Sequence, residues 1–354
     1  MRALIAFALT LAACRAAGPA AHDPLDDGRI AVAVSVPPQA YFVEKIGGSH
    51  VRVEVMIPPG YSHEDYSPSP RQIVALSHAR LYIKVGHPAF ELETHFIDPF
   101  LAGKPSVRVV DMSRGMELIR GEASEGGEEG SDPHVWVAPA TVRVAARNIG
   151  DALTGVDPAH AAEYQANLRA FLTEIDALDR EIRTRLGPFS SPRRFLVYHP
   201  SWGYFAQEYG LRQVAIEAEG KEPSAKRLIQ LIDDARRDDV RLLFVSRGFP
   251  RKSAQVIADA AGCRIVTADP QEHDWAANLR RVAVAIGEAY QAATVDNLRS
   301  PPPYPGLKPR ATCLRPPGDT TTHPEGRGQR PLWARARRPG FQPGAGEATP
   351  GAEE

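Results

Sequence analysis

A helical pattern of unusual length lies in the middle of this chain. It follows Asp157-Pro158 and ends before Gly187, and its apolar residues recur at spacings of three and four, at Leu168, Phe171, Leu172, Ile175, Leu178, Ile182 and Leu186. Asp157 is a suitable helix N-cap, and a proline at the first helical position loses no hydrogen bond. About 30 residues would give a helix of roughly 45 Å, longer than a strand–helix–strand unit requires. Residues 157–187 are therefore predicted to form a rigid spine between two folded parts.

Short apolar runs rich in β-branched residues lie on both sides of this helix, with helical stretches between them. The predicted strands are Arg29–Val36, Val51–Ile57, Ala79–Val85 and Val107–Met112 before the helix, and Arg194–His199, Arg212–Glu217, Val240–Ser246 and Cys263–Asp269 after it. Runs that are apolar nearly throughout are typical of strands covered on both faces, and strand–helix alternation favours parallel sheets. The predicted fold class is α/β, with an N-terminal lobe at 29–150 and a C-terminal lobe at 193–298 joined by the spine helix.

The N-terminal segment has the pattern of an export signal. Met1-Arg2 is followed by an apolar run that ends in Leu11-Ala12-Ala13-Cys14. A run of about a dozen residues is shorter than the roughly 20 that a membrane span needs. Its ending resembles the lipobox of bacterial lipoproteins, so 1–14 is predicted to be a lipoprotein signal peptide and Cys14 the acylated residue. We expect a lipid-anchored protein in the periplasm or at the cell surface; an ordinary signal peptide is the alternative.

Three further observations limit what the chain does. Residues 300–354 are rich in proline, arginine and glycine without apolar periodicity, and are predicted to be a disordered tail. The acidic, glycine-rich segment Gly121–Gly130 is predicted to be a mobile surface loop. The 42 basic and 43 acidic side chains argue against a nucleic-acid binder, which needs a basic face. Whether Cys263 pairs with Cys313 stays open.

Imidazole and carboxylate groups follow several of the predicted strands and loops. They are His63 and Glu64 in the loop after Ile57, His134 after Asp132-Pro133, His199 at the end of one strand and Asp269 at the end of another. Ligands of open α/β sheets gather at the carboxyl ends of the strands, and these groups are ligands of Zn²⁺ or Mn²⁺. Taken singly, each has a plainer explanation as a loop or turn residue.

The span from about 29 to 295 resembles the metal-binding proteins of ABC importers, the ZnuA/TroA-like group. The motifs that carry the resemblance are Pro58-Pro59-Gly60 with Tyr66-Ser67-Pro68-Ser69-Pro70, Asp132-Pro133-His134-Val135-Trp136, His199-Pro200-Ser201-Trp202-Gly203-Tyr204-Phe205, Glu222-Pro223-Ser224 and Asp269-Pro270. The resemblance implies two α/β lobes, a spine helix and one buried metal in the cleft, with one ligand from each of four loops. It implies that His134, His199 and Asp269 are three of these ligands.

The first ligand stays open between two neighbours. Counted from Gly60, the histidine of the family falls on Glu64, while His63 takes the preceding position. With His63 the ligands would be three nitrogens and a carboxylate, which favours Zn²⁺; with Glu64 they would be two nitrogens and two carboxylates, which Mn²⁺ also accepts. A histidine at the third position is typical of zinc-type members, so Zn²⁺ is favoured and Mn²⁺ is the alternative. Glu217, at a strand end, is a candidate to support a ligand.

The resemblance implies a solute-binding lipoprotein that captures the metal outside the cell and delivers it to the membrane permease of an ABC importer. Such a protein is not an enzyme, and a monomer is expected. Since histidines must lose protons to bind metal, the affinity is expected to fall as the pH drops through about 6.5. The alternatives are an adhesion or partner-binding lipoprotein with a structural metal, a siderophore-type binding protein, and a zinc hydrolase with Glu64 as its base.

Overall fold

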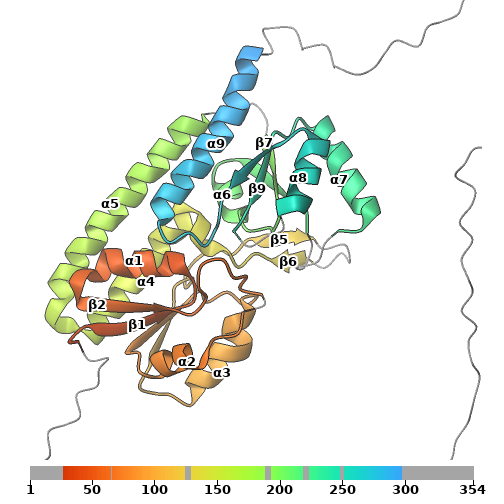
Figure 1. Cartoon of the computed structure of the whole chain (residues 1–354). Helices are drawn as coiled ribbons and strands as arrows, with labels where there is room; N and C mark the ends of the chain where they lie inside the picture. Colours follow the sequence, from red (N-terminus) through yellow and green to blue (C-terminus); the bar gives the residue numbers. More distant parts are fainter. Residues whose placement is uncertain are drawn as a thin grey trace, which may run out of the picture. The chain divides into compact units, whose positions relative to one another are not determined.

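The computed structural model describes residues 27–296, except residue 65 and the segments 124–128, 188–192, 218–222 and 248–250. The predicted signal peptide with Cys14, and the predicted tail with Cys313, therefore lie outside the described residues. Two four-stranded sheets, each parallel throughout, form the centre of the fold (Figure 1). The predicted α/β fold class is confirmed.

The first sheet is built from strands that precede the long helix. Across the sheet the order is β2 (Val51–Val55), β1 (Ile30–Val34), β3 (Leu81–Lys84) and β4 (Arg108–Asp111). The connections contain α1 (Pro37–Gly47), the short η1 (Gly48–His50), α2 (Pro70–Ser77), a π-helical turn η2 (Leu92–Ile97) and α3 (Asp98–Ala102). Ser69 caps α2 because its hydroxyl accepts a hydrogen bond from the Gln72 backbone, as expected for a helix that begins with proline.

The second sheet is built from strands that follow the long helix. Its order is β10 (Arg264–Thr267), β9 (Leu242–Val245), β7 (Arg193–Val197) and β8 (Leu211–Ala215). It is flanked by α6 (Gly203–Glu208), α7 (Ala225–Arg237) and α8 (Arg251–Ala261), and α9 (Trp275–Asp296) ends the described fold. Leu243 and Val245 of β9 pack in a separate apolar cluster with Ala254 and Ile257 of α8. The sheet is therefore covered on that face by helices, which explains its apolar strands.

The long helix α5 (Ala161–Leu186) follows a 3-10 turn, η4 (Pro158–His160), and runs beside both halves of the fold (Figure 1). It contacts α1 and α4 (Pro139–Val156) of the first half and α9 of the second. Its buried residues are Tyr164, Leu168, Phe171, Ile175, Leu178, Ile182 and Leu186, while Leu172 is partly buried. One apolar cluster accordingly includes strand residues from both sheets, such as Val34 and Phe195.

Two local predictions are wrong. Asp157 does not cap the helix: its carboxylate makes no capping bond and instead accepts a hydrogen bond from Tyr164 Oη at 2.7 Å. The predicted loop at 121–130 is not irregular throughout, because β5 (Arg120–Ala123) and β6 (Glu129–Ser131) pair antiparallel. Such short strands are held by backbone hydrogen bonds, so an acidic, glycine-rich sequence forms them without an apolar pattern.

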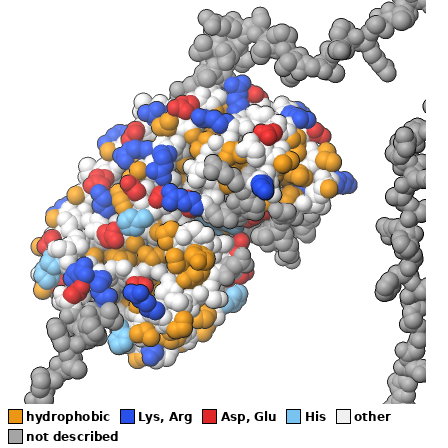
Figure 2. Space-filling model, in the orientation of Figure 1, with side chains coloured by type: hydrophobic (Ala, Val, Ile, Leu, Met, Phe, Trp, Pro, Cys, Tyr) orange, Lys and Arg blue, Asp and Glu red, His pale blue; other side chains and the backbone are white. Residues whose placement is uncertain are grey.

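The outer surface of the described residues is mixed in charge. On the face drawn in Figure 2, basic and acidic side chains are interspersed. Among the described helices, none has both the length and the hydropathy needed to cross a membrane. Cys263 is a half-buried free thiol that donates to the Val240 carbonyl, and burial raises its pKa to about 11.

Candidate metal centre

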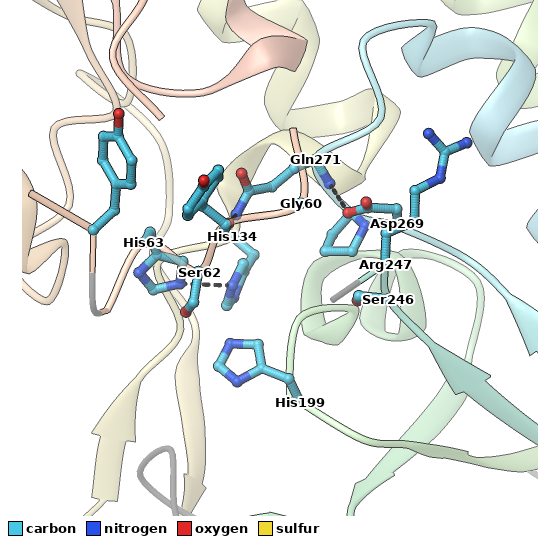
Figure 3. Close-up of a pocket in the computed structure, with 12 residues that line it drawn as sticks. Gly60, Ser62, His63, His134, His199, Ser246, Arg247, Asp269 and Gln271 are labelled. Carbon is cyan, nitrogen blue, oxygen red and sulfur yellow. Dashed lines mark hydrogen bonds between the residues drawn. The ribbon is translucent and has the colours of Figure 1, made fainter. Parts of the chain in front are cut away.

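A pocket of about 320 Å³ lies where loops from the carboxyl ends of the two sheets meet (Figure 3). Its walls come from the loops after β2, β7, β9 and β10 and from the segment before the 3-10 turn η3 (Val135–Val137). The polar residues in its lining include His63, His134, His199, Arg247, Asp269 and Gln271. Because all strands of each sheet are parallel, their carboxyl ends share one edge, and the loops that leave this edge converge.

Three buried histidines converge in this pocket. The possible ligand atoms of His63, His134 and His199 all lie within 4.8 Å of one another, and the Nε2 atoms of His63 and His134 are 3.1 Å apart. The three side chains come from three separate segments and point toward a common space in Figure 3. All three residues are less than one-tenth exposed. Buried nitrogen atoms this close to one another are arranged as the ligands of a metal ion must be.

Two of these histidines are oriented by carboxylates. His134 Nδ1 lies 2.7 Å from Asp132 Oδ1, which also accepts the His134 backbone N–H at 2.9 Å. His199 Nδ1 lies 2.5 Å from Glu217 Oε1. A carboxylate on Nδ1 fixes the tautomer of an imidazole and leaves Nε2 as the ligand atom, as in many zinc sites. Glu217 thus contacts His199 in the way that a supporting residue would, and Asp132, to which the sequence assigned no role, has the same relation to His134.

Burial and mutual charge separate the pKa values of the three imidazoles. Burial lowers the pKa of His63 well below its usual value, and the charges of His134 and His199 lower it further. Burial also lowers the pKa of His134, against the opposing effect of Asp132. For His199 burial acts in the same direction, but the hydrogen bond to Glu217 and the charge of Glu64 outweigh it and raise the pKa. With lowered pKa values, His63 and His134 stay neutral, and so able to bind a metal ion, to a lower pH than an ordinary histidine.

Asp269 lines the same pocket but does not belong to the group of atoms that lie within 4.8 Å of one another. Its carboxylate accepts the Gln271 backbone N–H at 3.0 Å, and Asn278 donates to its carbonyl at 2.7 Å. Burial raises the pKa of the Asp269 carboxyl. The structure thus places this residue at the edge of the histidine group, on the side of the second sheet (Figure 3).

Glu64 and His63 are neighbours that face different surroundings. A carboxylate oxygen of Glu64 lies within 4.8 Å of ligand atoms of His199 and Glu217, and Glu64 is not part of the pocket lining. The histidine group contains His63 instead. Of the two candidates for the first ligand, the structure brings His63 to His134 and His199, and places a carboxylate oxygen of Glu64 near His199 and Glu217.

Gly203 supports the site from the start of α6. A Cβ atom at this position would lie 2.2 Å from Asp132 Oδ2 and 3.1 Å from Ile119 Cδ1. No side chain therefore fits while the Asp132 carboxylate holds His134. The glycine lies within the motif that begins at His199, but spacing alone gave no reason to assign it a role.

Tryptophan side chains connect the two halves of the site. Trp136 donates from its indole nitrogen to the Pro270 carbonyl at 2.8 Å, and Trp275 donates to the Trp136 carbonyl at 2.6 Å. Both rings are buried. The segment that carries His134 is thus bonded to the loop that carries Asp269, so the two ligand-bearing segments are connected across the two lobes.

Comparison with known proteins gives one family. The family profile described as "ZnuA: Zinc-uptake complex component A periplasmic" matches residues 32–297. The chain is 26% identical over 268 residues to the high-affinity zinc uptake system protein ZnuA of Bacillus subtilis, over 72% of this chain and 83% of that protein. It is 25% identical over 285 residues to the zinc-binding lipoprotein AdcA of Streptococcus pneumoniae, over 77% of this chain and 55% of that protein. The chain therefore spans about half the length of AdcA.

Solved structures agree with this match. A crystal structure of ZnuA is similar with a TM-score of 0.67 and 38% identity, over 73% of this chain and 98% of that one. A zinc-bound deletion mutant of ZnuA is similar with a TM-score of 0.68 and 38% identity, over 74% and 98%. The Mn²⁺ complex of FpvC from Pseudomonas aeruginosa has a TM-score of 0.65 at 22% identity, over 75% and 99%, which is a likeness of fold alone.

Proposed function

The chain belongs to the ZnuA family, the metal-binding solute-binding proteins of ABC importers, and from this membership we propose that it captures Zn²⁺ and delivers it to a membrane permease. The ion would bind to Nε2 of His63, His134 and His199. Asp269 would complete the ligand set once its loop moves toward the histidines. In this proposal Glu64 is not a ligand.

The observation that supports this proposal best is the convergence of three buried imidazoles, two of which are oriented by carboxylates. Three nitrogens and one carboxylate form a tetrahedral donor set that suits Zn²⁺, whereas Mn²⁺ prefers more oxygen ligands. With all four positions filled by protein, no coordination site is left for a reactive water. Because the ion is transported and takes part in no reaction, four protein ligands with no open coordination position are the arrangement that capture requires.

Members of this family are transport binding proteins and not enzymes, so the zinc-hydrolase alternative is abandoned. Delivery requires a permease, and the family description of a zinc-uptake complex supports such a partner. Anchoring through Cys14 is part of the proposal and is supported by the lipobox-like sequence Leu11-Ala12-Ala13-Cys14. It would keep the captured ion beside the membrane that holds the permease.

Competitive titration of Zn²⁺ and Mn²⁺ against a chromophoric chelator tests the proposal. We expect the full chain to bind one Zn²⁺ more tightly than Mn²⁺. His63→Ala should weaken Zn²⁺ binding by more than about 100-fold, beyond the usual cost of losing a supporting residue, while Glu64→Ala should change it only a few-fold. Absence of one-to-one binding by the unmodified chain would contradict capture. Loss of binding in Glu64→Ala alone would contradict the assignment of His63.

A further inference from the structure

A positively charged side chain lies beside the proposed cation site. Arg247 and Asp269 follow the neighbouring parallel strands β9 and β10, in which Val245 is paired with Thr267. Each residue lies two positions beyond its member of this pair, so the two are side by side at the carboxyl edge of the sheet. Both line the pocket. A guanidinium at this place is unexpected, because it repels a divalent cation and attracts the carboxylate that would bind it.

The guanidinium of Arg247 is held away from the histidines by Glu272. Arg247 Nη2 lies 2.9 Å from Glu272 Oε2, and Figure 3 shows the side chain extending away from His63, His134 and His199. Glu272 is fixed by its backbone, since its N–H donates to the Asp269 carbonyl at 3.1 Å, and its carboxylate also lies 3.7 Å from Arg281. Of the pair, the Arg247 side chain is 60% exposed and the Glu272 side chain 22%. The carboxylate is thus the fixed partner and the arginine the one with room to move.

Without this ion pair, Asp269 is a buried carboxylate available to Arg247, because both residues line the same pocket. Burial raises the pKa of Asp269, and the charge and the backbone N–H of Arg247 act in the opposite direction, so the two groups already interact. A guanidinium binds a carboxylate with two parallel hydrogen bonds, which would occupy both oxygens, including the one that the metal would bind.

We propose that Glu272 is a positioning residue that keeps the Arg247 guanidinium from binding Asp269, and so leaves Asp269 available as the fourth ligand. The pair Arg247–Glu272 then sets the affinity of the site, with Arg247 acting as an internal competitor of the metal. This inference rests on the proposed capture of Zn²⁺ at the histidine group. It differs from that proposal because neither Arg247 nor Glu272 touches the ion.

A double-mutant cycle on the full chain tests the inference, with the dissociation constant for Zn²⁺ as the readout. Glu272→Gln should weaken Zn²⁺ binding at least tenfold. Arg247→Gln should bind Zn²⁺ somewhat more tightly than the unmodified chain, because a nearby cation has been removed. The double variant should bind like Arg247→Gln, since the competitor is gone and its restraint no longer matters.

The cycle also separates this role from two simpler ones. If Glu272 acted only through its own charge, or only by stabilising the fold, Glu272→Gln would weaken binding equally in both backgrounds, and that result would overturn the inference. The titrations are repeated in about 1 M sodium nitrate, where the screening length is about 3 Å. This removes most of the long-range electrostatic effect of the Glu272 charge on the ion. Tight Zn²⁺ binding with no effect of Glu272→Gln would refute this inference alone, whereas no binding by the unmodified chain would refute the capture proposal.

Discussion

His199 and Glu217 form a 2.5 Å contact between Nδ1 and Oε1 because they leave adjacent parallel strands in register. Val197 of β7 is paired with Ala215 of β8, and each residue of the contact lies two positions further along its strand. The register of the pairing extends beyond the ends of the two strands, so His199 and Glu217 also lie opposite each other and their side chains meet. The geometry of the metal centre is therefore partly a property of the strand pairing.

Replacing Glu217 by Gln should weaken Zn²⁺ binding by about 10- to 100-fold, because an amide holds the His199 tautomer less firmly than a carboxylate does. The measurement is the Zn²⁺ dissociation constant, together with the thermal midpoint of the metal-free protein as a control for folding. An unchanged dissociation constant would show that the contact with Glu217 does not support the site.

The pH dependence of Zn²⁺ affinity should be that of one proton. Because the pKa values of His63 and His134 are lowered and that of His199 is raised, His199 is the imidazole of the three that keeps its second proton to the highest pH. The affinity should fall as the pH drops through the raised pKa of His199, which places the onset above the value of about 6.5 expected for ordinary histidines. Calorimetry in buffers of different ionisation enthalpy measures the number of protons released. Release of two or three protons would contradict the separation of the pKa values.

Gly203→Ala should weaken Zn²⁺ binding about tenfold or more, and should lower the free energy of unfolding by about 1–3 kcal/mol. The new methyl group would overlap Asp132 Oδ2 and displace the carboxylate that orients His134. Gly103→Ala is a matched control, because the nearest atom to its Cβ would be 3.9 Å away. If both variants bind Zn²⁺ equally well, the space beside Asp132 is not needed for the site.

Glu93 should make the stability of the metal-free protein depend on pH. Burial raises the pKa of its carboxyl from 4.5 to about 7, although the Val85 and Gly86 backbone N–H groups and the Ser35 hydroxyl donate to it. A raised folded-state pKa gives stability that is full below pH 4.5 and is lost as the pH rises through 7. Relative to Glu93→Gln, the unmodified chain should lose about 3 kcal/mol of unfolding free energy over this range.

Urea denaturation of both proteins without metal, at pH values from 4.5 to 7, provides the comparison for Glu93. The histidines of the pocket titrate in both proteins, so their contribution cancels in the difference. A difference between the two proteins that stays constant over this range would contradict the prediction.

The periodic patterns of the sequence determined most of the fold. Eight apolar runs predicted the strands of two parallel sheets, and the three- and four-residue spacing from Leu168 to Leu186 predicted the helix that contacts both halves. These features are local, because a strand or helix must present its apolar side chains at its own period wherever it packs. The same reasoning placed His199 and Asp269 near one edge, since parallel strands end together, whereas His134, which follows neither parallel sheet, was assigned through the resemblance of its Asp-Pro-His motif.

Only the tertiary structure decided how the side chains of the site are arranged. Whether His63 or Glu64 faces His134 depends on the dihedral angles of one loop, because the two residues are adjacent in the sequence. The partners Glu217 for His199 and Glu272 for Arg247 depend on strand order, register and the path of a turn. These contacts join residues that are distant in sequence, and no local period encodes them. The sequence by itself thus determined which elements form and which loops carry ligand-type residues, while the packing of those elements decided which atoms meet.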